Sequence, residues 1–234
     1  MSYQAVQEKA VRKTPLIIAL PLILIASIFF SILIEWLGIM FIWEAQGSQH
    51  AYNMMINEYR YLNDDFKTGG RYSPFEFAKL SLSLLHEYGV NHKDIMRIET
   101  WVRSQEPSSS ALTQQLKLGL QACLEYIKAA FYTLQTFLMR FSLLLFSLPA
   151  VLLFSLVGIV DGLVRRDIRK WSGGRESGLL YHTSKKLILP SVALSWVVYL
   201  SLPFSIHPNF IVIPGAIATA MLFATSAGAF KKYL

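Results

Sequence analysis

Three long stretches of this 234-residue chain contain no Asp, Glu, Lys or Arg, and they limit its possible folds more than any other feature. Residues 15–34 and 141–160 are twenty residues each, and residues 187–230 are 44 residues. Because about 20 helical residues cross the roughly 30 Å core of a bilayer, the first two stretches each predict one transmembrane helix. The third predicts two helices joined by a turn at residues 206–209, where Pro208 disfavours helix at His207.

The composition agrees with a membrane protein. Hydrophobic residues make up 53% of the chain and charged residues only 16%, whereas soluble domains are about 25% charged. The single cysteine, Cys123, excludes an intramolecular disulfide and a metal cluster built from cysteines. The chain also lacks the motifs of serine hydrolases, zinc peptidases and phosphate-loop enzymes. We therefore expect no catalytic residue, no metal and no cofactor.

The charges predict an orientation. Residues 1–14 carry net charge +2, residues 161–186 carry +4 and the tail adds +2, whereas residues 44–140 carry ten basic and ten acidic residues. Because cytoplasmic loops are enriched in Lys and Arg, we place the basic segments and both termini in the cytoplasm. The basic excess then reflects topology and lipid contact, and we expect no direct binding of nucleic acid.

These assignments predict an all-α, four-helix transmembrane protein with a helical periplasmic domain between spans 1 and 2. The first apolar stretch is too long for the core of a cleavable signal peptide, so we interpret it as an uncleaved anchor. The expected order is a cytoplasmic N-terminus (1–14), transmembrane helix 1 (15–43), the periplasmic domain (44–140), transmembrane helix 2 (141–160), a basic cytoplasmic loop (161–186), transmembrane helix 3 (187–204), a periplasmic turn (205–209), transmembrane helix 4 (210–230) and a cytoplasmic tail (231–234).

The 44–140 segment is predicted to be helical. Apolar residues at steps of three and four predict one amphipathic helix through Ala51, Met55, Tyr59, Leu62 and Phe66. The pattern Ser73-Pro74-Phe75-Glu76 predicts the capped start of another.

A long helix is expected at the end of this segment. From about Ala111, apolar residues repeat every three or four positions into the second span, which predicts one helix as far as the region of Pro149. Its seam packs either on the preceding short helices or, as in a coiled coil, on a second copy or a partner. The seam consists of Leu120, Leu124, Ile127, Phe131, Leu134, Leu138 and Phe141.

Two charged residues, Glu35 and Arg140, each adjoin a twenty-residue apolar core, at what should be the same outer boundary. We expect them to form an interhelical ion pair, since pairing lowers the cost of each charge beside hydrocarbon. The alternative is that each reaches separately to the headgroups.

Small residues form a stripe along the last predicted span. Such a stripe lets another helix, from this chain or another subunit, approach closely in lipid. Its members are Ala216, Ala220, Ala224 and Gly228.

The predicted cytoplasmic loop has the most distinctive local sequence. Four cations are expected on a short helix facing anionic headgroups: Arg165, Arg166, Arg169 and Lys170. A polar turn follows at Gly174, Arg175, Glu176 and Ser177, and then the pair Tyr181 and His182. This loop either serves only to set topology or forms a docking surface for a cytoplasmic partner.

The sequence resembles the integrating conjugative element membrane proteins, a family of multipass proteins of unknown activity. The resemblance rests on three blocks: residues 34–38 with Met40, Trp43 and 47–50; Glu58 with Tyr61 and Leu62; and Asp161, Gly162, Arg165 and Arg166 with 174–177, Tyr181 and His182. It implies a role in conjugative DNA transfer through a type IV secretion-type apparatus of a Gram-negative inner membrane. It implies no catalytic residue.

We therefore expect a non-enzymatic accessory subunit of a conjugation or secretion complex. Its expected partners are membrane lipids, other subunits of the complex, the coupling ATPase and a second copy of the chain. A small membrane transporter or lipid-handling protein is the alternative, and it requires a polar cavity lined by Ser195, Ser201, Thr219 and Thr225. A membrane-embedded enzyme would have to use Glu58, His50 and the Arg175–Glu176 pair.

Overall fold

The computed structural model describes residues 16–66, 73–88, 92–104, 111–173 and 178–230. All secondary structure in these ranges is helical, which confirms the all-α class. The helices are α1 (Leu16–Phe41), α2 (Ser48–Asp65), α3 (Pro74–Tyr88), α4 (His92–Arg103), α5 (Ala111–Trp171), α6 (Gly178–Ser201) and α7 (Asn209–Gly228).

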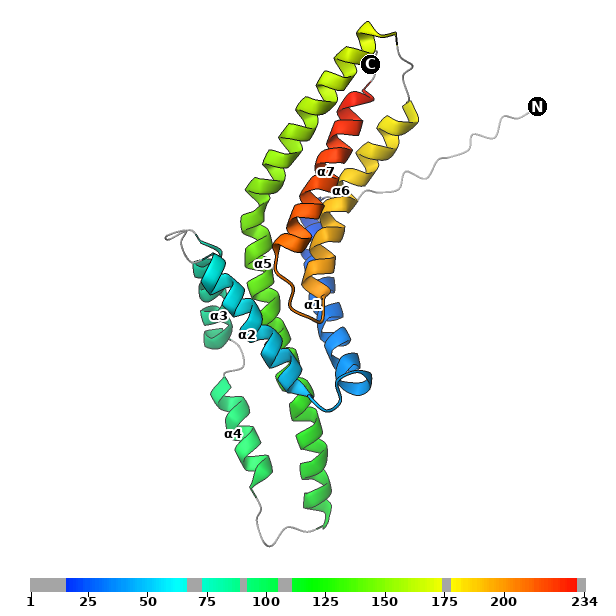
Figure 1. Ribbon diagram of the computed structural model, residues 1–234. Helices are drawn as coiled ribbons and strands as arrows, with labels where there is room; N and C mark the ends of the chain where they lie inside the picture. Colours follow the sequence, from blue (N-terminus) through cyan, green and yellow to red (C-terminus); the bar gives the residue numbers. More distant parts are fainter. Residues whose placement is uncertain (1–15, 67–72, 89–91, 105–110, 174–177, 231–234) are drawn as a thin grey trace, which may run out of the picture.

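Helix α5 is the axis of the molecule. It begins at the expected Ala111, but it continues through Pro149 to Trp171, so its 61 residues extend about 90 Å. A single proline removes only one backbone hydrogen bond, which neighbouring helices can compensate. Helices α2, α3 and α4 lie along its N-terminal half, and α6 and α7 lie along its C-terminal half (Figure 1).

Three of the described helices, not four, are long and apolar enough to cross a membrane: Pro21–Phe41, Gly119–Trp171 and Asn209–Gly228. The predicted span 187–204 is not among them, because α6 ends at Ser201, where Pro203 disfavours helix at Leu202. Lys185 and Lys186 lie inside the same helix, so its uncharged part is only residues 187–201. These residues extend about 22 Å, short of the hydrocarbon core.

Helix α7 packs closely on α5 through small residues. A Cβ atom added at Gly158 would overlap the carbonyl oxygen of Ala220, and one added at Gly162 would overlap that of Ala224. The predicted stripe therefore meets a Gly-x-x-x-Gly pair of the same chain, which the sequence analysis did not identify. The absence of a side chain at Gly158 and Gly162, and the small methyl groups of the facing alanines, permit this approach.

The shorter helices cover one side of α5. The backbone of Gly47 has φ +53° and turns the chain from α1 into α2. The carboxylate of Glu125 then accepts hydrogen bonds from the backbone N–H and the hydroxyl of Ser48 at the start of α2. Of the predicted α5 seam, Leu124 and Phe131 are buried, and they lie beside Val102 of α4 and His86 of α3. These contacts favour the intramolecular interpretation, although Leu120 and Ile127 remain exposed.

The predicted cap of α3 is present, and it makes a testable prediction. The Ser73 hydroxyl accepts a hydrogen bond of 3.2 Å from the Glu76 backbone N–H. We expect Ser73→Ala to destabilise this helix by about 1 kcal/mol, with faster hydrogen exchange at the amides of its first turn. Ser83→Ala is the control, since the exposed Ser83 hydroxyl bonds only to the Leu80 carbonyl. Equal exchange in both variants would contradict the capping role.

Candidate functional site

A fully buried ion pair joins three helices near the middle of α5. Arg140 is 1% exposed and Glu58, on α2, is 0% exposed. The Nε and Nη2 atoms of Arg140 donate to the same carboxylate oxygen of Glu58 at 3.0 and 2.8 Å. The hydroxyl of Tyr199, on α6, lies 3.4 Å from the other carboxylate oxygen, and the Arg140 guanidinium lies 5.3 Å from the Tyr199 ring centroid.

The remaining donors of Arg140 bind the end of α6. Nη1 donates to the carbonyls of Tyr199 and Leu202 at 3.1 and 2.6 Å, and Nη2 donates to that of Phe204 at 2.8 Å. All five guanidinium hydrogens therefore have acceptors. A cation beside the carbonyl-bearing end of a helix also interacts favourably with the helix dipole. Arg140 thus holds α2, α5 and the α6–α7 connection in one arrangement.

Burial dominates the electrostatics of this cluster. It raises the pKa of the Glu58 carboxyl above its usual value, while the neighbouring Arg140 guanidinium opposes that shift. A buried carboxylate without its partner would be strongly destabilising, so the two residues depend on each other. Protein groups satisfy both side chains, so the cluster holds α2, α5 and α6 together.

The predicted Glu35–Arg140 pair is wrong. Glu35 is 1% exposed, and its carboxylate lies 2.9 Å from Nδ1 of His50, whose ring stacks on Trp43 with centroids 4.0 Å apart. The neighbouring Trp36 donates to the carbonyl of Tyr126, fourteen residues before Arg140 on α5. Ile39, one turn beyond Glu35, shares a buried cluster with Ala129, eleven residues before Arg140, so the two charges lie at different levels.

Sequence reasoning missed Glu58 as the partner of Arg140, and the helical pattern explains why. The expected apolar face of α2 included Met55 and Tyr59, whereas the structure buries Ser48, Ala51, Met54, Glu58 and Leu62. The available signal was the position of Glu58, four residues from both Met54 and Leu62 on the same side of the helix. Such a residue on a buried face indicates a buried partner.

The predicted interaction residues that the structure describes lie at one end of the bundle, where α5 ends, α6 begins and α7 ends (Figure 1), and we call it the basic end. Arg165 pairs with Asp161 and Lys170 with Asp167, and both pairs are largely exposed. Arg169 donates to the carbonyl of Gly228, the last residue of α7. Tyr181 contacts His182 and Phe230 edge to face. Gly174, Arg175, Glu176 and Ser177 lie outside the described residues.

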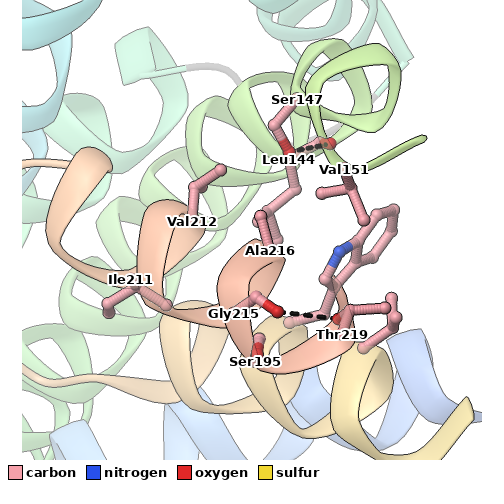
Figure 2. A pocket seen from close by; sticks show the side chains of 11 residues that line it. Leu144, Ser147, Val151, Ser195, Ile211, Val212, Gly215, Ala216 and Thr219 are labelled. Atoms are coloured by element: carbon pink, nitrogen blue, oxygen red, sulfur yellow. Dashed lines mark hydrogen bonds between the residues drawn. The ribbon is translucent and has the colours of Figure 1, made fainter. Parts of the chain in front are cut away.

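A small cavity lies between α5, α6 and α7 (Figure 2). Its volume is about 20 Å³, which accommodates a single water molecule. Ser195 and Thr219, two residues expected to line a transport path, do line it, but their hydroxyls donate to the carbonyls of Ser191 and Gly215 in their own helices. This cavity therefore gives no support to the transporter alternative.

The described residues bring together no group of three His, Cys, Asp or Glu side chains that could hold a metal ion. His50 lies against Glu35, and Nδ1 of His86 lies 2.6 Å from the carbonyl of Leu82.

One comparison identifies a related group of proteins. The family model described as "IncC plasmid conjugative DNA transfer protein DtrJ-like" matches residues 42–231, which is most of the chain. No curated protein and no solved structure matches the sequence. The match confirms the connection with conjugation that the sequence resemblance implied.

Proposed function

The chain belongs to the DtrJ-like family of IncC plasmid conjugative DNA transfer proteins, and on this premise we propose that it is a non-enzymatic inner-membrane subunit of the DNA-transfer complex. In this proposal α1, α5 and α7 cross the membrane, α6 returns the chain beside α7 from the end of α5 to the start of α7, and α2–α4 form a periplasmic layer. The protein contributes surfaces for assembly, and one of them docks the cytoplasmic ATPase that couples DNA to the secretion apparatus.

The observation that carries the membrane proposal is the apolar outer surface of the helices. Side chains that a soluble protein would bury are more than 60% exposed: Leu22 and Ile25 on α1, Leu152, Leu153 and Val157 on α5, and Phe210 and Met221 on α7. Exposed apolar surface of this extent marks contact with lipid or another protein. The buried contacts that stabilise the bundle lie on its inner side, in clusters that include Phe137, Leu144 and Tyr199.

The observation that supports docking is the basic end. Residues 161–186 carry seven basic and three acidic residues, and the side chains of Arg165 and Lys170 are 66% and 45% exposed. Exposed cations steer and select an acidic partner. The cytoplasm is the proposed side for this end because positively charged loops remain there.

Reporter fusions test the orientation. We expect a periplasmic reporter to be active when fused after residue 66 or 104 and inactive after residue 173, with the opposite result for a cytoplasmic reporter. The protein should also fractionate with the inner membrane and require detergent for release. Activity of one reporter at all three positions, or recovery without detergent, would refute the proposal.

Pull-down of the coupling ATPase from detergent extracts tests the docking. We expect the double variant Arg175→Ala/Glu176→Ala to recover about tenfold less ATPase than the wild type, as expected when one charged contact of about 1.4 kcal/mol is lost. Arg60→Ala/Glu76→Ala is the matched control, because it removes one exposed cation and one exposed anion from α2 and α3. Unchanged recovery by the loop variant would refute docking through this loop while leaving the membrane location intact.

A further inference from the structure

A groove of about 460 Å³ opens between α5, α6 and α7 at the basic end. This volume is within the usual range of ligand sites. Its lining includes Arg166 of α5 and Lys185 of α6, and it contains no acidic residue. The remaining lining is mostly apolar and aromatic, and the proposed function does not use it.

The two cations face aromatic rings instead of carboxylates. The Arg166 guanidinium lies 5.5 Å from the ring centroid of Phe230, and the Lys185 amine lies 5.6 Å from that of Tyr181. The two rings contact each other edge to face at 5.6 Å. Neither cation forms an ion pair within the described part of the chain. Their charge is therefore available to an external anion, in contrast to that of Arg165 and Lys170.

The polar and apolar linings occupy different depths. Ile159 precedes Arg166 by seven residues on α5, and Phe223 precedes Phe230 by seven on α7, so the apolar wall extends about 10 Å inward from the cations. Ile188 continues this wall from α6, one turn beyond Lys185. The groove thus has a cationic mouth at the end of the bundle and an apolar floor toward its middle.

We propose that this groove binds an anionic phospholipid. The phosphate lies between Arg166 and Lys185, and an acyl chain lies along Ile159, Ile188 and Phe223. Charge complementarity selects the headgroup, since basic pockets between transmembrane helices bind anionic lipids at the cytoplasmic face. The proposal depends on the membrane location of these helices, which is part of the proposed function. A bound lipid would bridge α6 and α5, which contact each other much less than α5 and α7 do.

Native mass spectrometry of the full-length protein released from detergent tests this site. We expect phosphatidylglycerol to remain bound, phosphatidylcholine to bind much more weakly, and glycerol phosphate, which has no acyl chains, not to bind. Arg166→Gln/Lys185→Gln should weaken phosphatidylglycerol binding by roughly 30-fold, because each lost cation weakens it about fivefold. Arg165→Gln/Lys170→Gln removes the same charge from the same end outside the groove and should change binding less than threefold. Ser226→Phe, which fills the groove without changing charge, should also weaken binding.

Each alternative outcome is distinct. Equal losses in the two charge variants would show a general surface attraction and overturn the site. Equal retention of phosphatidylglycerol and phosphatidylcholine would do the same. A lipid-free dimer whose mass is lost in the Ser226→Phe variant would show that a second copy covers the groove. If the protein fractionates with the membrane but shows any of these results, only this inference fails. If it does not fractionate with the membrane, the proposed function fails first.

Discussion

Replacing Arg140 with methionine is expected to lower the unfolding temperature of the detergent-solubilised protein by roughly 6–20 °C. The substitution strands the fully buried Glu58 carboxylate and removes the donors to three carbonyls at the end of α6. Removing one partner of a buried ion pair costs about 3–5 kcal/mol, and each kcal/mol corresponds to about 2–4 °C in a chain of this size. Thermal unfolding followed by tryptophan fluorescence measures the change.

Two further variants show whether the stranded carboxylate causes this loss. Arg140→Met/Glu58→Leu removes both charges, and we expect it to recover part of the lost stability, because an apolar pair replaces a buried ion pair at little cost. Arg165→Met, on the same helix, removes a cation that is 66% exposed and should change the unfolding temperature by less than about 2 °C. If the double variant is as unstable as Arg140→Met, the stranded Glu58 carboxylate is not the cause of the lost stability.

The second large effect is expected from Gly162→Leu. Any side chain at this position overlaps the backbone of Ala224 and the Cβ of Ala227, so α7 has to move away from α5. Overpacking of this kind costs about 3 kcal/mol when backbone has to shift, which corresponds to roughly 6–12 °C in the unfolding temperature. The same fluorescence measurement applies, and proteolysis at the α6–α7 connection should become faster.

Gly119→Leu is the matched control for this prediction. Gly119 lies on the same helix, and a Cβ atom added there meets no atom within 4 Å. Leucine also favours helix over glycine by roughly 0.8 kcal/mol, so this variant should be as stable as the wild type or slightly more stable. If both substitutions destabilise the protein equally, the loss in Gly162→Leu does not come from disturbed packing between α5 and α7.

The candidate site was only partly predictable from the sequence. Glu35 and Arg140 were identified because a charge beside twenty apolar residues needs a partner, and both are indeed buried. Their partners were not identified, because His50 and Glu58 belong to the helix after the first span, and two positions of its buried face were each misplaced by one residue, at Met55 and Tyr59 instead of Met54 and Glu58. A one-residue error turns a helix by about 100°, which exchanges a buried position for an exposed one.

The number of predicted spans was also wrong because of a few individual residues. Composition predicted a helix over 187–204, but Pro203 and the two lysines in α6 leave too short an apolar segment. The small-residue stripe was visible on α7, whereas its counterpart consists of only two glycines, Gly158 and Gly162, in a 61-residue helix.

The amino-acid sequence by itself determined the all-helical class, the long apolar segments and the clustering of positive charge, because each depends on residues that are neighbours along the chain. Only the tertiary structure decided which charges pair, which face of α2 is buried and which helix receives the stripe on α7. These depend on residues 15 to 141 positions apart, brought together by the rotation and level of each helix against α5. Hydrophobic periodicity indicates that a helix has a buried face, but it does not specify what that face meets.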